Sequence, residues 1–218
     1  MKRFNFIKEN LKTNILASII TILPIFVGII LWNKLPDMVA THWGPQGVPD
    51  GYSSKAFAVF AMPAFMLIFH WLCMFISCLD KRMENQTQKA LKLVFWLCPV
   101  LSLLASFITY STALGFGFNI AKISVILMGV LFIVIGNYLP KTTQNFHLGI
   151  RLPWTLKSEK NWNMTHRFAG KLWLIGGIAS LLLSLTPVKV CFIIFAVDLL
   201  LMVIVPTLYS YIIYKREK

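Results

Sequence analysis

The segment from Thr13 to Trp32 reads TNILASIITILPIFVGIILW, twenty residues without a charged side chain. A helix of about 20 apolar residues is long enough to cross a bilayer. Four further runs approach that length, at Ala56 to Cys78, Leu91 to Leu114, Ile120 to Leu139 and Val190 to Tyr214. Hydrophobic residues form 57% of the chain and charged residues 13%, a far more apolar balance than that of a soluble domain. The sequence therefore predicts an integral membrane protein.

A sixth apolar run, Leu172 to Leu185, is too short to cross a bilayer by itself. Residues at helical spacing lead into it, namely Trp162, His166, Ala169 and Trp173, so we expect one helix that begins near Ser158 and continues into the membrane. Ser158 is a favourable N-cap residue. The fold predicted is all-α, a single membrane domain over residues 1–218 with six transmembrane helices.

Lys and Arg residues gather on one side of this predicted topology. With the N-terminus inside, 17 of the 21 lie in cytoplasmic segments, where membrane proteins concentrate them. We therefore expect both termini to be cytoplasmic. The net charge of +13 does not indicate nucleic-acid binding, because the cations lie in short blocks beside the spans, where topology and anionic lipid headgroups account for them.

The cysteines do not suggest a metal centre. Cys73, Cys78, Cys98 and Cys191 all lie in apolar spans, so neither a disulfide framework nor a zinc-binding spacing is visible. We interpret them as small buried hydrophobic residues, and we predict no metal and no cofactor.

The first long loop, residues 33–55, reads NKLPDMVATHWGPQGVPDGYSSK and is expected outside the cell. Its Gly and Pro residues favour tight turns, which predicts a compact segment. The candidate ligand-contacting residues are Pro36, Asp37, His42, Trp43, Asp50 and Lys55. Such groups could bind a metal or catalyse acid-base chemistry, but the chain has no HExxH motif, no nucleophile elbow and no second histidine at ligand spacing. A loop braced by hydrogen bonds from His42 and Asp50 is the favoured interpretation.

A second polar segment, residues 137–171, reads NYLPKTTQNFHLGIRLPWTLKSEKNWNMTHRFAGK and leads into the fifth predicted helix. Arg151 lies between Gly149 and Pro153, a context that restricts the backbone and could aim the guanidinium at a carboxylate, a phosphate or a backbone carbonyl. We expect Arg151 and His166 to belong to one packed cytoplasmic cap. The alternatives are an interfacial anchor, with tryptophans at headgroup level, and a binding or catalytic site.

Two residues within predicted spans are candidates for function. Asp198 is the only acidic residue well within one, and His70 lies in the second span. An intramembrane acid is a functional candidate by default. The structural alternative for Asp198 is an interhelical hydrogen bond or an ion pair with Lys122 or Lys189, and for His70 a hydrogen-bonded packing role.

Both polar segments resemble a known family. The outer loop carries Leu35-Pro36-Asp37, Thr41-His42-Trp43 and Gly47 to Lys55, which is similar to a small extracytoplasmic domain of unknown function in bacterial multispan membrane proteins. The second segment looks like the signature of the SdpI immunity family. The signature positions are Asn137, Pro140, Asn145, Gly149, Arg151, Pro153, Trp154, Thr155, Trp162, Thr165, His166 and Arg167.

The resemblance covers nearly the whole chain and implies a location in the bacterial cytoplasmic membrane. It implies protection of the cell from a secreted, membrane-active peptide toxin, with no catalytic residue. Some members also hold a small cytoplasmic repressor at the membrane. We therefore expect a non-enzymatic immunity protein that meets toxin at the outer loop. The alternatives are a small ion-coupled transporter or exporter using Asp198 and His70, and less favoured, a membrane enzyme using His42 and Asp50 or Arg151 and His166.

Overall fold

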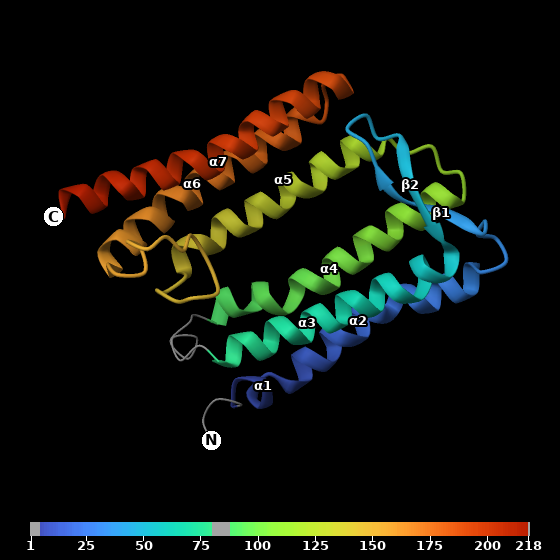
Figure 1. Ribbon diagram of the computed structural model, residues 1–218, viewed down its shortest axis with the longest axis horizontal. Coiled ribbons are helices and arrows are strands. Elements are labelled where there is room, and N and C mark those ends of the chain that lie inside the picture. Colours follow the sequence, from blue (N-terminus) through green and yellow to red (C-terminus); the bar gives the residue numbers. More distant parts are fainter. Residues whose placement is uncertain (1–4, 80–87, 218) are drawn as a thin grey trace. The chain divides into compact units, whose positions relative to one another are not determined.

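The computed structural model describes the backbone of residues 5–79 and 88–217 and the side chains of residues 7–79 and 94–217 (Figure 1). The fold is mostly helical. Its helices are α1 (Asn5–Glu9), α2 (Leu11–Leu31), α3 (Met62–Leu79), α4 (Gln88–Ala113), α5 (Ile120–Tyr138), α6 (Glu159–Leu183) and α7 (Val188–Arg216). A π-helical segment, η2 (Phe57–Ala61), precedes α3, and a 3-10 turn, η4 (Leu139–Lys141), follows α5.

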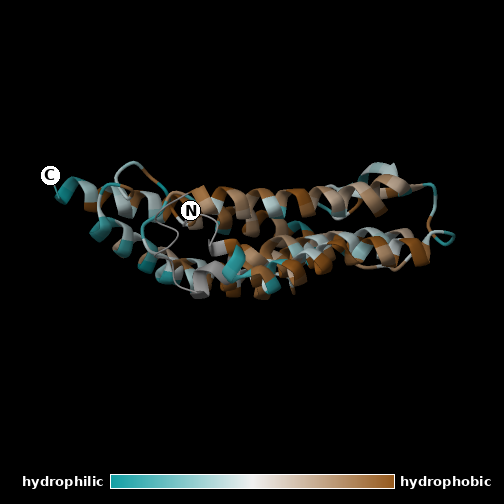
Figure 2. Ribbon diagram, turned by 90° about the horizontal axis from the view of Figure 1, so that it is seen from below, coloured by the Kyte–Doolittle hydropathy of each residue, from teal (hydrophilic) through white to brown (hydrophobic). Residues whose placement is uncertain are grey.

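Five helical segments of the described residues are long and apolar enough to cross a bilayer: Leu11–Leu31, Phe57–Leu79, Val94–Ala113, Ile120–Lys141 and Val188–Arg216. They confirm five of the six expected spans as apolar helices. In Figure 2, most of the length of the long helices has the brown colour of hydrophobic residues. Helix α6 is not among the five, because polar residues fill its first half. The sixth crossing and the cytoplasmic position of the termini stay predictions.

Helix α6 is nevertheless one continuous helix, as the sequence predicted. It begins after Ser158, whose Oγ accepts a hydrogen bond from the Asn161 N–H at 3.1 Å. This bond satisfies one of the backbone donors that a helix start leaves open. Ser158 therefore fixes where the helix begins. The part of the polar segment between η4 and α6, residues 142–158, is called the insert.

Contacts divide the chain into two compact units, Met1–Leu79 with Val94–Ala121 (unit 1) and Asp80–Leu93 with Lys122–Lys218 (unit 2). In unit 1, α2 and α4 are joined by interhelical hydrogen bonds. Ser102 Oγ donates to the Thr21 carbonyl at 2.8 Å, and Tyr110 Oη donates to the Pro24 carbonyl at 3.1 Å. Such bonds hold helices together where lipid supplies little hydrophobic driving force.

Residues 33–55 of unit 1 contain a two-stranded sheet, which corrects the all-α prediction. Strands β1 (Met38–Trp43) and β2 (Pro49–Ser54) pair antiparallel, from Met38 opposite Ser54 to Trp43 opposite Pro49. The turn between them contains Gly47 with a φ of 77°, a conformation that favours glycine. Residues of β2 alternate between half-buried and exposed, as in a strand with one covered face.

In unit 2, α5 and α6 approach each other at two pairs of glycines. A Cβ on Gly136 would lie 2.8 Å from the Gly170 carbonyl oxygen, and one on Gly177 would lie 2.6 Å from the Gly129 carbonyl oxygen. Any side chain at these positions would therefore push the helices apart. Helix α7 runs antiparallel to α6, and Trp173 Nε1 of α6 donates to the Met202 carbonyl of α7 at 3.0 Å.

Candidate functional site

The β1–β2 hairpin exposes apolar and charged side chains together. Met38, Val48 and Tyr52 are 54%, 61% and 58% exposed. His42 and Asp50 are also exposed, and His42 Nδ1 lies 2.5 Å from Asp50 Oδ1. This contact is the brace across the loop that the sequence suggested. The hairpin therefore offers a fixed surface of mixed chemistry outside the apolar helices.

The base of the hairpin is fixed to the end of α2. Lys55 Nζ lies 3.0 Å from Asp37 Oδ1 and 5.1 Å from the centre of the Trp32 ring. The Lys55 N–H also donates to the Asp37 carbonyl at 2.9 Å. Pro36 is exposed and Trp43 is half-buried. Of the loop candidates, Asp37 and Lys55 thus hold the base, while His42 and Asp50 lie farther out.

The second candidate surface begins with a turn built around Asn145. This side chain is fully buried, and its Oδ1 accepts hydrogen bonds from the N–H groups of His147 at 2.7 Å and Leu148 at 2.6 Å. Its Nδ2 donates to the carbonyls of Thr143 at 2.8 Å and Leu148 at 3.0 Å. One amide therefore satisfies four backbone groups and determines the path of residues 143–148.

Thr155 holds the next part of the insert in the same way. Its Oγ1 accepts from the Leu152 N–H at 2.9 Å and lies 2.8 Å from the Ile150 carbonyl oxygen, to which it donates. Its own carbonyl accepts from Gln144 Nε2 at 2.7 Å. Thr155 is buried, so each of these bonds replaces one that water would otherwise supply.

His166 joins the insert to α6. Its Nε2 accepts from the Ile150 N–H at 2.9 Å, and its Nδ1 lies 2.8 Å from the Trp162 carbonyl oxygen. A carbonyl only accepts, so the ring carries its proton on Nδ1 and is neutral. Burial lowers the pKa of His166 to about 4, opposed by the bond to Trp162. Gly149 has a φ of 105°, and a Cβ there would collide with the His166 ring.

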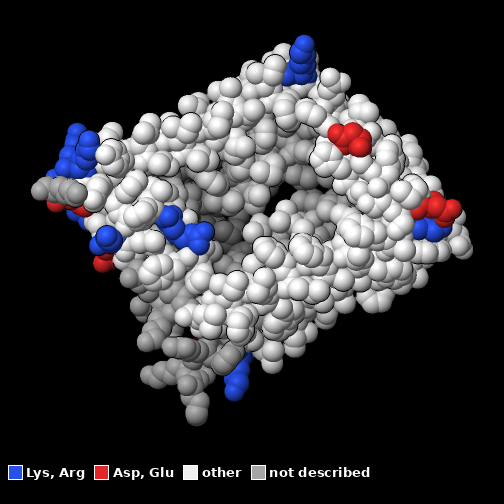
Figure 3. All heavy atoms as spheres, in the orientation of Figure 1, with Lys and Arg blue, Asp and Glu red and all other residues white. Residues whose placement is uncertain are grey.

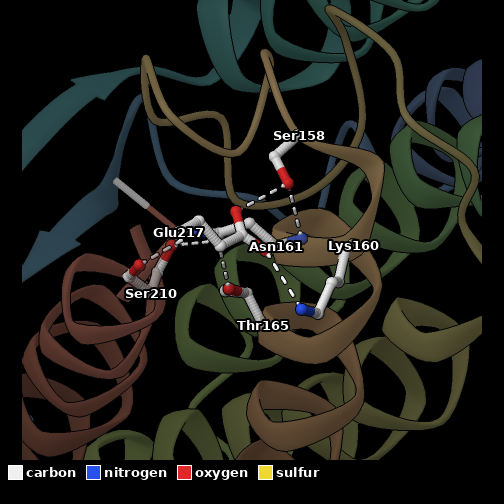
Figure 4. A network of polar contacts seen from close by, with 6 residues as sticks. All are labelled: Ser158, Lys160, Asn161, Thr165, Ser210 and Glu217. Atoms are coloured by element: carbon white, nitrogen blue, oxygen red, sulfur yellow. Dashed lines mark hydrogen bonds and ion pairs between the residues drawn. The ribbon is translucent and has the colours of Figure 1, made fainter. Parts of the chain in front are cut away.

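A network of side chains joins α6 to α7 (Figure 4). Asn161 Nδ2 donates to the Ser210 carbonyl at 2.9 Å, and Ser210 Oγ donates to Asn161 Oδ1 at 2.8 Å. Thr165 Oγ1 donates to the same Oδ1 at 3.0 Å. Trp154 Nε1 of the insert donates to Ser210 Oγ at 2.8 Å. Three segments therefore meet at one buried serine.

Two further contacts surround this network. Ser158 Oγ donates to Glu217 Oε2 at 3.0 Å, and Lys160 Nζ lies 3.7 Å from Glu217 Oε1 (Figure 4). Trp162 is fully buried, and its Nε1 donates to the Thr142 carbonyl at 3.0 Å. The first turn of α6 is thus held to the end of α7 and to the start of the insert.

The guanidinium of Arg151 meets a backbone carbonyl, one of the three partners considered from the sequence. Its Nη1 donates to the Phe146 carbonyl at 2.6 Å and supports the turn that Asn145 forms. Eight signature residues therefore lie in one packed cap: Asn145, Gly149, Arg151, Trp154, Thr155, Trp162, Thr165 and His166. The side chains of the other four do not join this network of hydrogen bonds among the described residues. Asn137 lies in the last turn of α5, Pro140 lies in η4, and Pro153 and Arg167 are exposed.

The intramembrane candidates differ from each other. Asp198 is half-buried, and its Oδ2 accepts a hydrogen bond from Ser180 Oγ of α6 at 3.1 Å. This is an interhelical hydrogen bond, the structural role considered for it. His70 is fully buried with its ring edge-on to Trp71, and its nitrogens have no hydrogen-bond partner among the described residues. The hydrogen-bonded packing role expected for His70 is therefore not found.

Three further residues, Asn161, Gln144 and Ser210, belong to the cap but were not predicted from the sequence. Asn161 precedes Thr165 by one helical turn, a spacing that indicates a shared face. Gln144 lies beside Asn145 but bonds to Thr155, eleven residues away, and no local pattern predicts that pairing. Ser210 is a small polar residue within an apolar helix, which is a weak signal of a buried partner.

Comparison with known proteins matches most of the chain. The model of the SdpI/YfhL protein family matches residues 141–210, and that of a domain of unknown function (DUF1648) matches residues 19–67. The immunity protein SdpI of Bacillus subtilis (strain 168) is 31% identical over 209 residues, which cover 94% of this chain and 98% of that protein. No solved structure matches. Together with the five apolar helices, these matches identify a multi-pass protein of the bacterial cell membrane.

Proposed function

Because the chain belongs to the SdpI family, we propose that it is a non-enzymatic immunity protein that protects its cell from a secreted, membrane-active peptide toxin. The observation that supports this most is the match to an immunity protein along nearly the full length of both chains. In this proposal the hairpin meets the toxin. The cytoplasmic cap holds α5, α6 and α7 in place.

The surface chemistry of the hairpin supports a peptide ligand. Met38 and Tyr52 offer apolar area that is already ordered, while His42 and Asp50 offer polar partners farther out on the same hairpin. An ordered surface loses little conformational entropy when it binds, so it supports affinity better than a flexible loop does. A membrane-active peptide carries both apolar and polar groups, and the hairpin exposes partners for both.

Survival of a sensitive cell tests the proposal. The chain is expressed in a Bacillus subtilis strain that lacks its own immunity protein, and the cells are exposed to culture medium from a toxin-secreting strain. We expect the unaltered chain to protect. The double variant Met38→Ser/Tyr52→Ser should lower protection at least tenfold at an unchanged membrane level. Leu185→Ser, which alters an apolar residue that is 80% exposed in the α6–α7 turn, is the matched control.

Two results would count against the proposal. If the unaltered chain reaches normal membrane levels and gives no protection, the immunity role is wrong. If the hairpin variant protects as well as the control, toxin is met elsewhere on the protein.

A signalling role is a second proposal, in which the cytoplasmic cap holds a small repressor at the membrane. Lys157, Lys160 and Arg216 are exposed at this end of unit 2, and Figure 3 shows Lys and Arg gathered near the C-terminal end of α7. These cations would suit an acidic partner surface. Co-purification of a cytoplasmic DNA-binding protein after toxin exposure, and its loss in Lys157→Glu/Arg216→Glu, is the expected result. Recovery of the same protein without toxin would contradict a toxin-dependent signal.

The contacts give less support to transport or catalysis. Asp198 bonds to Ser180, both nitrogens of His166 are occupied by backbone groups, and Arg151 donates to a carbonyl. A general base needs an open nitrogen or oxygen within reach of a substrate proton. We therefore assign these residues to the structure of unit 2 and propose no reaction for them.

A further inference from the structure

One stripe of exposed residues runs along α6 and changes chemistry midway. Exposed positions recur every three or four residues, so they share one side of the helix. The stripe contains Arg167 and Lys171, and then Leu174, Ile175, Ile178 and Leu182, which are 38%, 63%, 47% and 62% exposed. Two cations one turn apart are thus followed directly by an apolar path on the same side.

Arg167 and Lys171 of α6 lie closer to the turn between α6 and α7 than Lys215 and Arg216 of α7 do. From Lys171 to Leu185 a helix rises about 21 Å, against a hydrocarbon layer of about 30 Å. The neighbouring α7 has no charged side chain other than Asp198 between Lys189 and Lys215, a rise of about 39 Å. The α6 cations therefore lie at a depth where α7 is still apolar.

The pairing of α6 with α7 gives the same result. Trp173 bonds to the Met202 carbonyl and Asn161 bonds to Ser210, so Lys171 is level with residues just after Met202. At that level α7 exposes Val203 and Ile204, which are 54% and 48% exposed. A cation beside such residues needs a negatively charged group that reaches the edge of the hydrocarbon layer.

We propose that Arg167 and Lys171 bind the phosphate of an anionic phospholipid whose acyl chain lies along Leu174 to Leu182. Within the described part of the chain neither cation has an ion pair or a hydrogen bond, so both are available to a ligand. Long cationic side chains extend toward headgroups while their stems stay in apolar surroundings. From Leu174 to Leu182 the helix rises about 12 Å, which is most of the thickness of one leaflet, about 15 Å.

Lipid titration of the purified full chain tests the site. Phosphatidylglycerol or phosphatidylcholine is added to the protein in dodecyl maltoside, and bound lipid is counted by native mass spectrometry. The probe pair distinguishes headgroup charge from general lipid affinity. We expect phosphatidylglycerol to bind at least tenfold more tightly than phosphatidylcholine. Arg167→Gln/Lys171→Gln should lose about fivefold in affinity per cation removed, and Lys171→Arg should retain binding.

The matched control is Lys34→Gln/Lys189→Gln, which removes two exposed cations at other helix ends. It should change affinity less than twofold. Because all four side chains are exposed, thermal unfolding without added lipid should be unchanged in both double variants. Equal losses in the two double variants, or unchanged phosphatidylglycerol affinity in the α6 variant, would overturn the proposal.

Discussion

His166 should make the stability of unit 2 depend on pH between about 4 and 6.5. The folded protein holds the ring neutral, because Nδ1–H donates to the Trp162 carbonyl and Nε2 accepts from the Ile150 N–H. If Nε2 were protonated, its N–H would face the Ile150 N–H, so two donors would meet without an acceptor in a buried site. Burial is the main reason that the pKa is lowered to about 4 from 6.5, because it disfavours the charged ring. We expect acid to favour the unfolded chain.

The magnitude follows from the two pKa values. The unfolded chain takes up the proton near pH 6.5 and the folded chain only near pH 4, so the stability contributed by the neutral ring is complete above pH 6.5 and is lost as pH falls toward 4. At pH 5 the difference of 1.5 units corresponds to about 2 kcal/mol. That is a large part of the stability of a typical domain.

Unfolding in detergent at pH 7 and at pH 5 measures this loss. His166→Gln keeps an acceptor for the Ile150 N–H but cannot be protonated. Between pH 7 and pH 5, the free energy of unfolding of the unaltered chain should therefore fall by about 2 kcal/mol more than that of His166→Gln. Asn163→Gln, an uncharged substitution at an exposed position of the same helix, is the control and should follow the unaltered chain. If His166→Gln and the unaltered chain lose the same free energy, the neutral-ring reasoning is refuted.

Other changes test helix contact, Asp198 and topology. Gly170→Ala should lower unfolding free energy by about 1–3 kcal/mol, because its Cβ would lie 2.7 Å from the Gly136 carbonyl oxygen, while Gly117→Ala, with open space around it, should change little. Asp198→Asn should keep membrane levels and most protection in the survival assay, since an amide still accepts from Ser180; loss of protection at normal levels would indicate an ion site. An impermeant thiol reagent on intact cells should label a cysteine at Gln46 but not one at Lys157, and the reverse pattern would invert the topology.

The helices could be predicted from the sequence because their signal is local. Thr13 to Trp32 has no charged residue, and the structure places a helix at Leu11–Leu31. Ser158 could be predicted as a cap because a serine followed by an acidic residue is a local pattern. Such features depend on residues within one or two turns of each other, so a single sequence contains them.

Contacts between distant segments could not be predicted in the same way. The strands β1 and β2 are short and contain Pro49 and Gly51, which lower the strand signal, and their pairing depends on the turn at Gly47. The partner of Trp154 is Ser210, 56 residues later, and nothing near either residue indicates the other. The sequence predicted that Arg151 and His166 belong to one cap, because Pro153 restricts the backbone near Arg151. It did not predict that both side chains bond to the same segment, Arg151 to the Phe146 carbonyl and His166 to the Ile150 N–H.

The difference in apolar length between α6 and α7 gives a physical reason for the insert. Beside the polar first half of α6, α7 remains apolar for two to three more turns. Without the insert, Ser210 and Tyr211 in this part of α7 would lie at the surface of α7. Trp154 bonds to Ser210 and its ring lies 5.4 Å from that of Tyr211 and 5.7 Å from that of Tyr214. Tryptophan and tyrosine favour the membrane interface. The insert thus covers the part of α7 that extends beyond the apolar half of α6, and hydrogen bonds from the Asn145 and Thr155 side chains to its backbone hold it in that position.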